Sequence, residues 1–318
     1  MRINAKFLLA LATSTFLTFT TQYFVGLPAN VAIWGINSDN DCFELIGTAW
    51  QKRGTQKMRS ISVGYGGNVL GVTQTGQFCE WSQSKNDWVT KTPTPKLYDI
   101  SISWDDIWAI GSNYSIYILK NGTWQKQQGL LRQVSVGGKQ GNPVVMGTNK
   151  NNQAFEWTGD GWRQIGTIPI LYISVSDLGN AFAVGTDNKV YNFNNDKWSV
   201  IDSPPLVKVE NSHGEVWALD SSNKIWRWLH NGTMKPTNPS RVQNGWEQTD
   251  GLLRHIAIGG MSGAKMMPSH TMGKPQLIGG MAGISPQAKK EMREKLRIEE
   301  RKLQEKLKDI RRKIRSIK

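Results

Sequence analysis

Cysteine and charged residues are both scarce in this sequence. The 318-residue chain has two cysteines, and Asp, Glu, Lys and Arg together make up 20% of it. Two cysteines exclude a small scaffold held together by several disulfides. Nucleophile elbows, metal-ligand spacings, phosphate-binding loops and dinucleotide fingerprints are also missing. We therefore expect no enzyme, and hence no catalytic residue, no metal and no cofactor.

Tryptophan and glycine, in contrast, are abundant, with 14 and 32 residues. Tryptophan side chains bury large apolar surfaces, and glycine permits the backbone conformations of tight turns. This composition favours a β protein that is rich in aromatic residues and in turns.

The net charge of +14 is unevenly distributed along the chain. Residues 31–260 contain 21 Lys and Arg against 19 Asp and Glu, whereas residues 261–318 contain 16 against 6. The basic character therefore belongs to the C-terminal segment, and it does not indicate a specific nucleic-acid partner for the rest of the chain.

Six tryptophans recur at regular intervals and divide the sequence into units. The spacings between them are 38, 36, 38, 36 and 48 residues. They are Trp50, Trp88, Trp124, Trp162, Trp198 and Trp246. Because the same residue type returns in every unit, we interpret these rings as packing residues between repeats and not as ligand contacts.

Each unit contains short apolar segments that precede the strand bearing its tryptophan. In the unit that ends at Trp124 they are residues 98–102, 106–110 and 117–119. Four short strands that recur in this way are typical of a propeller blade. The sequence therefore predicts an all-β protein whose core is a six-bladed β-propeller.

The two ends of the repeat region complete one another. The first unit lacks an inner strand before Trp34, and an apolar segment at 254–259 remains after the last unit. Pairing of the N-terminal and C-terminal strands would complete the sixth blade and remove an open sheet edge.

The repeats resemble those of the tectonin-type β-propeller lectins. The shared pattern is G-x-W-x-x-x-x-G, then L-x-x-V-S-V-G, then V-W-A/G-I/V and an aromatic strand that ends in G-x-x-W. Residues 122–137, 32–50, 58–72 and 153–162 carry it best. This resemblance spans residues 31–260 and implies a six-bladed propeller that often recognises carbohydrate. Some relatives are instead intracellular adaptors in membrane traffic.

Candidate ligand-binding residues lie in the loops that vary between units. The loops after the first and third strands of each blade should open on the same face, because the strands alternate in direction. The first set of loops carries Tyr65, Trp104, Asp105, Asp106 and His213. The second set includes a long insertion at 229–244. An aromatic ring beside carboxylates suits a sugar, so Trp104 with Asp105 and Asp106 is the best candidate set.

The two cysteines fall at different positions of their strands. Cys79 occupies an aromatic position, whereas Cys42 precedes the equivalent residue, Phe43. We expect their side chains to point to opposite faces of neighbouring sheets and beyond disulfide reach. Two free, buried thiols are therefore predicted.

The N-terminus indicates export. Residues 1–29 place Arg2 and Lys6 before an apolar, threonine-diluted stretch, which is typical of a signal peptide. An uncleaved membrane anchor or a buried helix is the alternative, with a membrane-anchored or cytoplasmic protein as the consequence. Three glycosylation sequons, at Asn113, Asn121 and Asn231, are compatible with a secreted glycoprotein.

The C-terminal segment changes character twice. Residues 261–284 are rich in Gly and Met and are expected to form a flexible linker, and residues 285–318 are expected to form a basic α-helix. Apolar residues recur along it with the heptad spacing of a short coiled coil. They are Leu296, Leu303, Leu307, Ile310, Ile314 and Ile317. Three interpretations stay open: a homo-oligomer, attachment to an anionic membrane or surface, and a solvated helix without a partner.

These observations together predict a secreted, lectin-like propeller that binds glycans or glycoconjugates without covalent chemistry. The basic helix would make it multivalent or attach it to a surface. The alternative is a protein-interaction scaffold that uses the propeller face for a partner protein.

Overall fold

The structure, a computed structural model, describes residues 31–92, 94–230 and 234–260. The expected leader (1–29), the linker (261–284), the C-terminal helix (285–318) and Asn231 lie outside the described residues. Within the described part of the chain, no helix has the length and hydropathy needed to cross a membrane.

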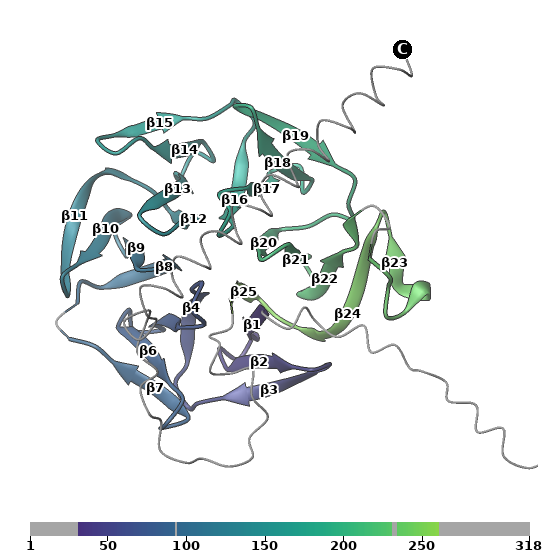
Figure 1. Cartoon of the computed structure of the whole chain (residues 1–318), viewed down its shortest axis with the longest axis horizontal. Helices are drawn as coiled ribbons and strands as arrows, with labels where there is room; N and C mark the ends of the chain where they lie inside the picture. The colour runs from purple at the N-terminus through teal and green to yellow at the C-terminus, as the bar shows by residue number, and fades with distance from the viewer. Residues whose placement is uncertain (1–30, 93, 231–233, 261–318) are drawn as a thin grey trace, which may run out of the picture. The chain divides into compact units, whose positions relative to one another are not determined.

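Six antiparallel sheets form the blades of a propeller and surround a common centre (Figure 1). Blade 1 comprises β25 (His255–Gly260), β1 (Val31–Ile36), β2 (Cys42–Ile46) and β3 (Ala49–Arg53). Blade 2 comprises β4 (Met58–Val63), β5 (Val69–Thr73), β6 (Phe78–Ser82) and β7 (Asp87–Thr90). Blade 3 comprises β8 (Leu97–Ser103), β9 (Asp106–Gly111), β10 (Ser115–Lys120) and β11 (Thr123–Leu130).

The second half of the propeller repeats this arrangement with one elaboration. Blade 4 comprises β12 (Gln133–Lys139), β13 (Asn142–Thr148), β14 (Ala154–Trp157) and β15 (Trp162–Gln164). Blade 5 comprises β16 (Ile170–Val175), β17 (Ala181–Gly185), β18 (Val190–Asn194) and β19 (Lys197–Ile201). Blade 6 comprises β20 (Lys208–Ser212), β21 (Glu215–Leu219), β22 (Lys224–Trp228) and β24 (Trp246–Leu252). The insertion adds the short helix η2 (Pro239–Arg241) and a fifth strand, β23 (Val242–Gln243).

The ring closes by pairing the two ends of the repeat region. Strand β25 runs antiparallel to β1, with Trp34 opposite Ala257 and Gly35 opposite Ile256. The predicted closure of a six-bladed ring by its terminal strands is therefore confirmed.

The hydrophobic core is divided among the gaps between adjacent blades. Each of the six clusters of buried residues draws its members from two neighbouring blades. Strands β1, β5 and β21 are buried at every position, because a blade is covered by neighbours on both faces. The stability of one blade therefore depends on the next.

The recurring tryptophans hold neighbouring blades together. The indole Nε1 of Trp50 donates a hydrogen bond to the carbonyl oxygen of Asp250, and that of Trp162 donates to Gln128, each at 3.1 Å. Trp198 and Trp246 make the same kind of bond to the outer strand region of the blade before them. These contacts show that four of the six recurring rings, those of Trp50, Trp162, Trp198 and Trp246, bridge neighbouring blades, as expected of packing residues.

Both cysteines are free and buried, as predicted. Cys42 and Cys79 lie in the same hydrophobic cluster, between blades 1 and 2. Burial raises the pKa of both thiols, which disfavours the reactive thiolate.

Candidate functional site

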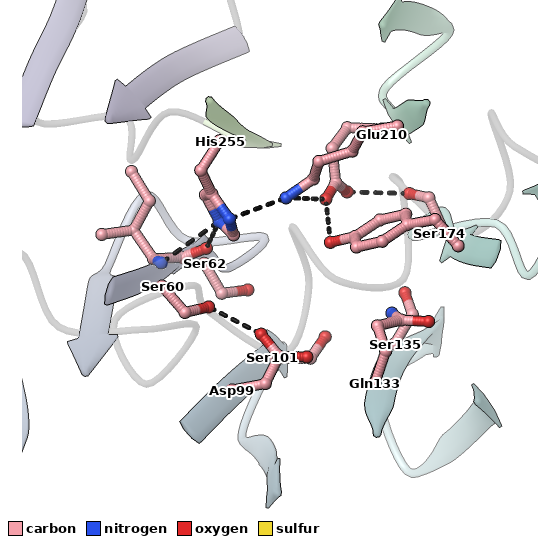
Figure 2. Close-up of polar contacts among 12 residues, drawn as sticks. Ser60, Ser62, Asp99, Ser101, Gln133, Ser135, Ser174, Glu210 and His255 are labelled. Carbon is pink, nitrogen blue, oxygen red and sulfur yellow. Dashed lines mark hydrogen bonds and ion pairs between the residues drawn. The ribbon is translucent and has the colours of Figure 1, made fainter. Parts of the chain in front are cut away.

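The inner strands β4, β8, β12, β16, β20 and β25 line a central channel (Figure 1). Two sets of mostly polar side chains alternate with core residues along these strands, as the two-residue period of a β-strand requires. The first set is Ser60, Asp99, Gln133, Tyr172, Lys208 and His255. The second set is Ser62, Ser101, Ser135, Ser174 and Glu210. Figure 2 shows how members of both sets lie around the channel.

The serines of the second set link the inner strands of successive blades. Each Ser Oγ accepts a hydrogen bond from a backbone nitrogen of the next blade, at 2.9–3.0 Å. The bonded pairs are Ser62 with Ile102, Ser101 with Val136, Ser135 with Val175 and Ser174 with Asn211. The serine that follows Ile or Val at this inner-strand position thus satisfies backbone groups that an inner edge strand would leave unpaired.

Polar and charged residues of blades 1, 5 and 6 meet in the channel (Figure 2). Lys208 Nζ lies 3.4 Å from Glu210 Oε1 and 2.8 Å from His255 Nδ1. The other carboxylate contacts of Glu210 come from Tyr172 Oη at 2.7 Å and Ser174 Oγ at 2.9 Å. Lys208, Ser174 and His255 are buried, Tyr172 and Glu210 are half-buried, and the polar groups of these residues bond to one another.

Burial and proximity determine the protonation of His255. Burial, and then the neighbouring Lys208 ammonium, hold the pKa of the imidazole well below its usual range. A neutral ring accepts a hydrogen bond from Lys208 at Nδ1 and donates one from Nε2 to the Ile61 carbonyl oxygen, 2.8 Å away. Burial likewise raises the pKa of the Asp99 carboxyl, which accepts a hydrogen bond from Ser60 at 2.7 Å.

Three of the residues singled out from sequence meet at one end of the channel. The ring of Tyr65 stacks on that of Trp104, with centroids 3.6 Å apart, and it lies 5.0 Å from the ring of His213. These three residues, here called the aromatic cap, come from the turns after the inner strands of blades 2, 3 and 6. Indole Nε1 of Trp104 also donates a hydrogen bond to the Gly138 carbonyl oxygen of blade 4.

The backbone holds two members of the aromatic cap in an uncommon conformation. Trp104 and His213 have φ angles of 52° and 51°, in the left-handed region that residues other than glycine adopt at a cost. Each lies in a two-residue turn between paired strands, since Ser103 faces Asp106 and Ser212 faces Glu215.

The two aspartates of the sequence-derived set lie apart from these ring contacts. Asp105 accepts a hydrogen bond from Gln140 of blade 4, and Asp106 begins strand β9. Burial, followed by repulsion from Asp105, raises the pKa of the Asp106 carboxyl. The cavity that Tyr65 lines beneath the aromatic cap measures only about 30 Å³, which is room for a single water molecule.

None of the described residues covers the opposite end of the channel. Here a cavity of about 350 Å³ is bordered by Arg59, Arg132, Arg254 and Tyr98 and reaches inward to Asp99 and His255. The channel therefore has a basic mouth at one end and an aromatic cap at the other.

A second cavity of similar size, about 340 Å³, lies between blades 1 and 6. Trp50 lines it from blade 1, Trp217, Arg227 and Glu247 line it from blade 6, and Asn238 belongs to the insertion. This cavity is called the inter-blade cleft below. The cleft combines apolar rings with polar groups in one concave surface, as ligand pockets commonly do.

Buried charges hold the floor of the inter-blade cleft in place. Arg227 and Glu215 form a two-point ion pair, with Nε and Nη2 each 2.8 Å from a carboxylate oxygen. Glu247 is fully buried, and its Oε1 accepts hydrogen bonds from the Thr237 hydroxyl and the Asn238 backbone nitrogen. Among the described residues, its Oε2 has no hydrogen-bond partner.

A family model for the Tectonin domain matches residues 139–264, a range that includes strands β13 to β15 of blade 4, blades 5 and 6, and the closing strand β25. The six-bladed ring and its closure agree with this match. The match and the six-bladed ring together fit a tectonin-type propeller. The match suggests a lectin-like or a protein-interaction propeller and does not choose between these two classes.

Solved structures are similar to this chain at low sequence identity. A chain of the nidogen/laminin complex is 11% identical, with a TM-score of 0.53 over 72% of this chain and 98% of that chain. Human WBSCR16 is 11% identical (TM-score 0.46; 69% and 78% covered), and Prp20p from Saccharomyces cerevisiae is 12% identical (TM-score 0.44; 70% and 73% covered). No curated protein sequence matches the chain.

Sequence reasoning missed the inter-blade cleft of the tectonin-type propeller. Its residues come from the two ends of the repeat region, and Trp50 was interpreted only as a packing residue. The insertion at 229–244 was the available signal, because it interrupts the regular spacing just before Trp246. The sequons at Asn113 and Asn121 lie exposed in turns, and their glycosylation stays a prediction.

Proposed function

We propose that this tectonin-type propeller binds carbohydrate, and that the inter-blade cleft is the binding site. The observation that carries the proposal is the lining of the cleft, where the ring of Trp50 lies beside polar groups of blade 6 and of the insertion. Glu247 borders the cleft as well, and its buried Oε2 is an acceptor without a partner among the described residues, which a ligand hydroxyl would reach only after a small shift of the side chain.

The remaining groups of the cleft suit a sugar. The ring of Trp50 offers an apolar surface to the C–H groups of a pyranose, while Arg227, Thr237 and Asn238 offer polar groups to its hydroxyls. The volume of about 340 Å³ is within the range of small-ligand pockets, roughly 300–1,000 Å³. The ion pair between Arg227 and Glu215 fixes the floor before a ligand arrives, which lowers the entropic cost of binding.

The aromatic cap is a less suitable site for a sugar, despite its prominence in the sequence. Tyr65 and Trp104 stack on each other, so one face of each ring is already covered. A ligand at the cap would also find no deeper cavity than about 30 Å³.

A glycan array tests the proposal with matched variants. Wild-type protein should bind a restricted set of glycans, and Trp50→Ala and Glu247→Gln should reduce that binding about tenfold or more. Trp162→Ala is the control, because Trp162 makes the same interblade hydrogen bond as Trp50 but does not line the cleft. Equal losses in Trp50→Ala and Trp162→Ala would assign the effect to folding and contradict the proposal. A blank array together with capture of a partner protein would favour the scaffold alternative.

Secretion and clustering complete the proposed function. The apolar heptad seam in residues 285–318 would bring several propellers together, and linked weak sites gain avidity. Light scattering on the full chain and on a chain without residues 285–318 should give an oligomer and a monomer, respectively. N-terminal sequencing of the exported protein should show a mature chain that begins close to residue 30, and retention of residues 1–29 would contradict export by a cleaved signal.

A further inference from the structure

The basic mouth of the channel gathers three arginines around one cavity. Arg59, Arg132 and Arg254 precede the inward-facing residues Ser60, Gln133 and His255 on the inner strands of blades 2, 4 and 1. All three side chains are half-buried, so water screens their charges less than at an open surface. Arg59 lies over the ring of Tyr98, with its guanidinium carbon 5.1 Å from the ring centroid.

The three guanidinium groups have no acidic partner within the part of the chain that the structure describes. Among the described residues, none of the three forms an ion pair with a carboxylate. Asp99 is the only acidic residue among those that line the cavity, and it accepts hydrogen bonds from Ser60 and from the Val134 backbone nitrogen. The lining of the cavity therefore carries three positive charges against at most one negative charge. Burial and the charge of Arg59 lower the pKa of Arg254, as expected where cations are crowded.

Unused hydrogen-bond donors accompany this excess of charge. A guanidinium group has five N–H donors. Arg59 donates one hydrogen bond, to the Gln74 carbonyl, and Arg132 donates two, to Thr148 and Leu171. Arg254 donates three, to Asn40, Met58 and Arg59. Each side chain is thus held in position by the protein while donors remain for a ligand.

We infer that the basic mouth binds a ligand with closely spaced anionic groups, of the phosphate or sulfate ester class. Planar guanidinium groups match such oxyanions with paired hydrogen bonds. The cavity of about 350 Å³ admits a small ligand, and the aromatic cap closes the far end of the channel, so the ligand enters and leaves by this mouth. This site shares no lining residue with the inter-blade cleft and does not depend on carbohydrate binding there.

Inorganic pyrophosphate and a trisulfated heparin disaccharide are the two probes, because they represent the phosphate and sulfate sources of the same chemistry. Isothermal titration of the full chain at low ionic strength should show a binding event that weakens as NaCl is added. Arg59→Gln and Arg132→Gln should each weaken it about tenfold or more, and Arg59→Lys, which keeps the charge, should weaken it less. Arg163→Gln is the control, because Arg163 is exposed on blade 4 and already paired with Glu156 and Asp196.

A residue-resolved measurement separates the mouth from the basic C-terminal segment. Phenylglyoxal labelling of wild-type protein, followed by peptide mass spectrometry, should show protection of Arg59 and Arg132 by the probe and none of Arg163. Protection of Arg59 and Arg132 by either probe supports the inference and shows whether the ligand is of the phosphate or the sulfate type. Binding that is unchanged in Arg59→Gln and Arg132→Gln would overturn the inference. Equal labelling of Arg59 with and without each probe would also overturn it, and this second test uses wild-type protein, so it holds even if the variants fold poorly.

Discussion

The Oγ atom of Ser135 on blade 4 accepts a hydrogen bond from the backbone nitrogen of Val175 on blade 5, 2.9 Å away. A single side chain thereby satisfies a group on the inner edge of the next sheet. The same relationship between successive blades recurs at Ser62, Ser101 and Ser174. The recurring inner-strand serine of blades 2 to 5 therefore links successive blades around the channel.

Replacement of Ser135 by alanine should destabilise the propeller. Ser135→Ala leaves the buried Val175 N–H without its acceptor, at a cost of about 1–3 kcal/mol in the free energy of unfolding. Urea denaturation measures this difference. Ser84→Ala removes an exposed hydroxyl in the β6–β7 turn and should change stability by less than about 0.5 kcal/mol; equal values for the two variants would refute the linking role.

Truncation of Ile256 in the closing strand should weaken the whole ring. Ile256 is fully buried in the cluster between blades 6 and 1, so Ile256→Ala should lower the free energy of unfolding by about 2–5 kcal/mol. Val200→Ala, at a residue that is 60% exposed on β19, serves as the comparison. A loss no greater than that of Val200→Ala would mean that β25 does not hold the ring closed.

His255 should make the propeller sensitive to mild acid. Its pKa is lowered in the folded protein, so the unfolded chain binds a proton more readily once the pH falls below about 6.5. The stability contributed by neutral His255 is present above that pH and is lost as the pH falls toward the folded-state pKa. The free energy of unfolding, measured from pH 7.5 to 5, should therefore fall less steeply with decreasing pH in His255→Gln than in the wild type. The difference in slope should correspond to the uptake of up to one proton on unfolding. Parallel slopes in the two proteins would contradict this assignment.

The two thiols should be unreactive until the protein unfolds. Burial raises the pKa of Cys42 and Cys79, and only the thiolate attacks a disulfide reagent. At pH 8 we expect slow reaction with Ellman's reagent in native protein and rapid reaction of both thiols in denaturant. Immediate reaction of two thiols in the native state would show that the gap between blades 1 and 2 opens readily.

Trp104 provides a direct comparison of the two candidate glycan sites. The sequence-based hypothesis expects Trp104→Ala to abolish glycan capture while leaving the fold intact. The inter-blade cleft instead predicts that Trp104→Ala keeps glycan binding and that Trp50→Ala loses it. The same glycan array, with circular dichroism to verify folding, distinguishes them, since loss of binding in Trp104→Ala alone would return the site to the aromatic cap.

The propeller was predictable because its information is local and repeated. Alternation in each segment, a tryptophan at each closing position and an orphan strand at 254–259 together specified six blades and their closure. The placement of Tyr65, Trp104 and His213 at one end of the channel was predictable as well, because the turns after the inner strands all open on the same face. That their rings would contact one another did not follow, since the left-handed turns at Trp104 and His213 direct those side chains.

The two cavities were not predictable from the repeat. Glu247 and Trp50 are far apart in sequence, and neither departs from its strand pattern in a way that signals a ligand. In the sequence, nothing marks Arg59, Arg132 and Arg254 as a group, because they are isolated basic residues in a region whose charge is nearly balanced. Their shared cavity exists because closure of the ring brings the starts of the inner strands to one mouth.

The sequence by itself determined the all-β class, the number of blades, the closing strand and the burial of both thiols. These features depend on side-chain alternation and on packing positions that every repeat reproduces. Only the tertiary structure decided which polar residues face one another across the channel and between blades 1 and 6. Such contacts depend on the rotation from blade to blade, which brings residues of different repeats within hydrogen-bond distance. The sequence of a single repeat does not specify that rotation.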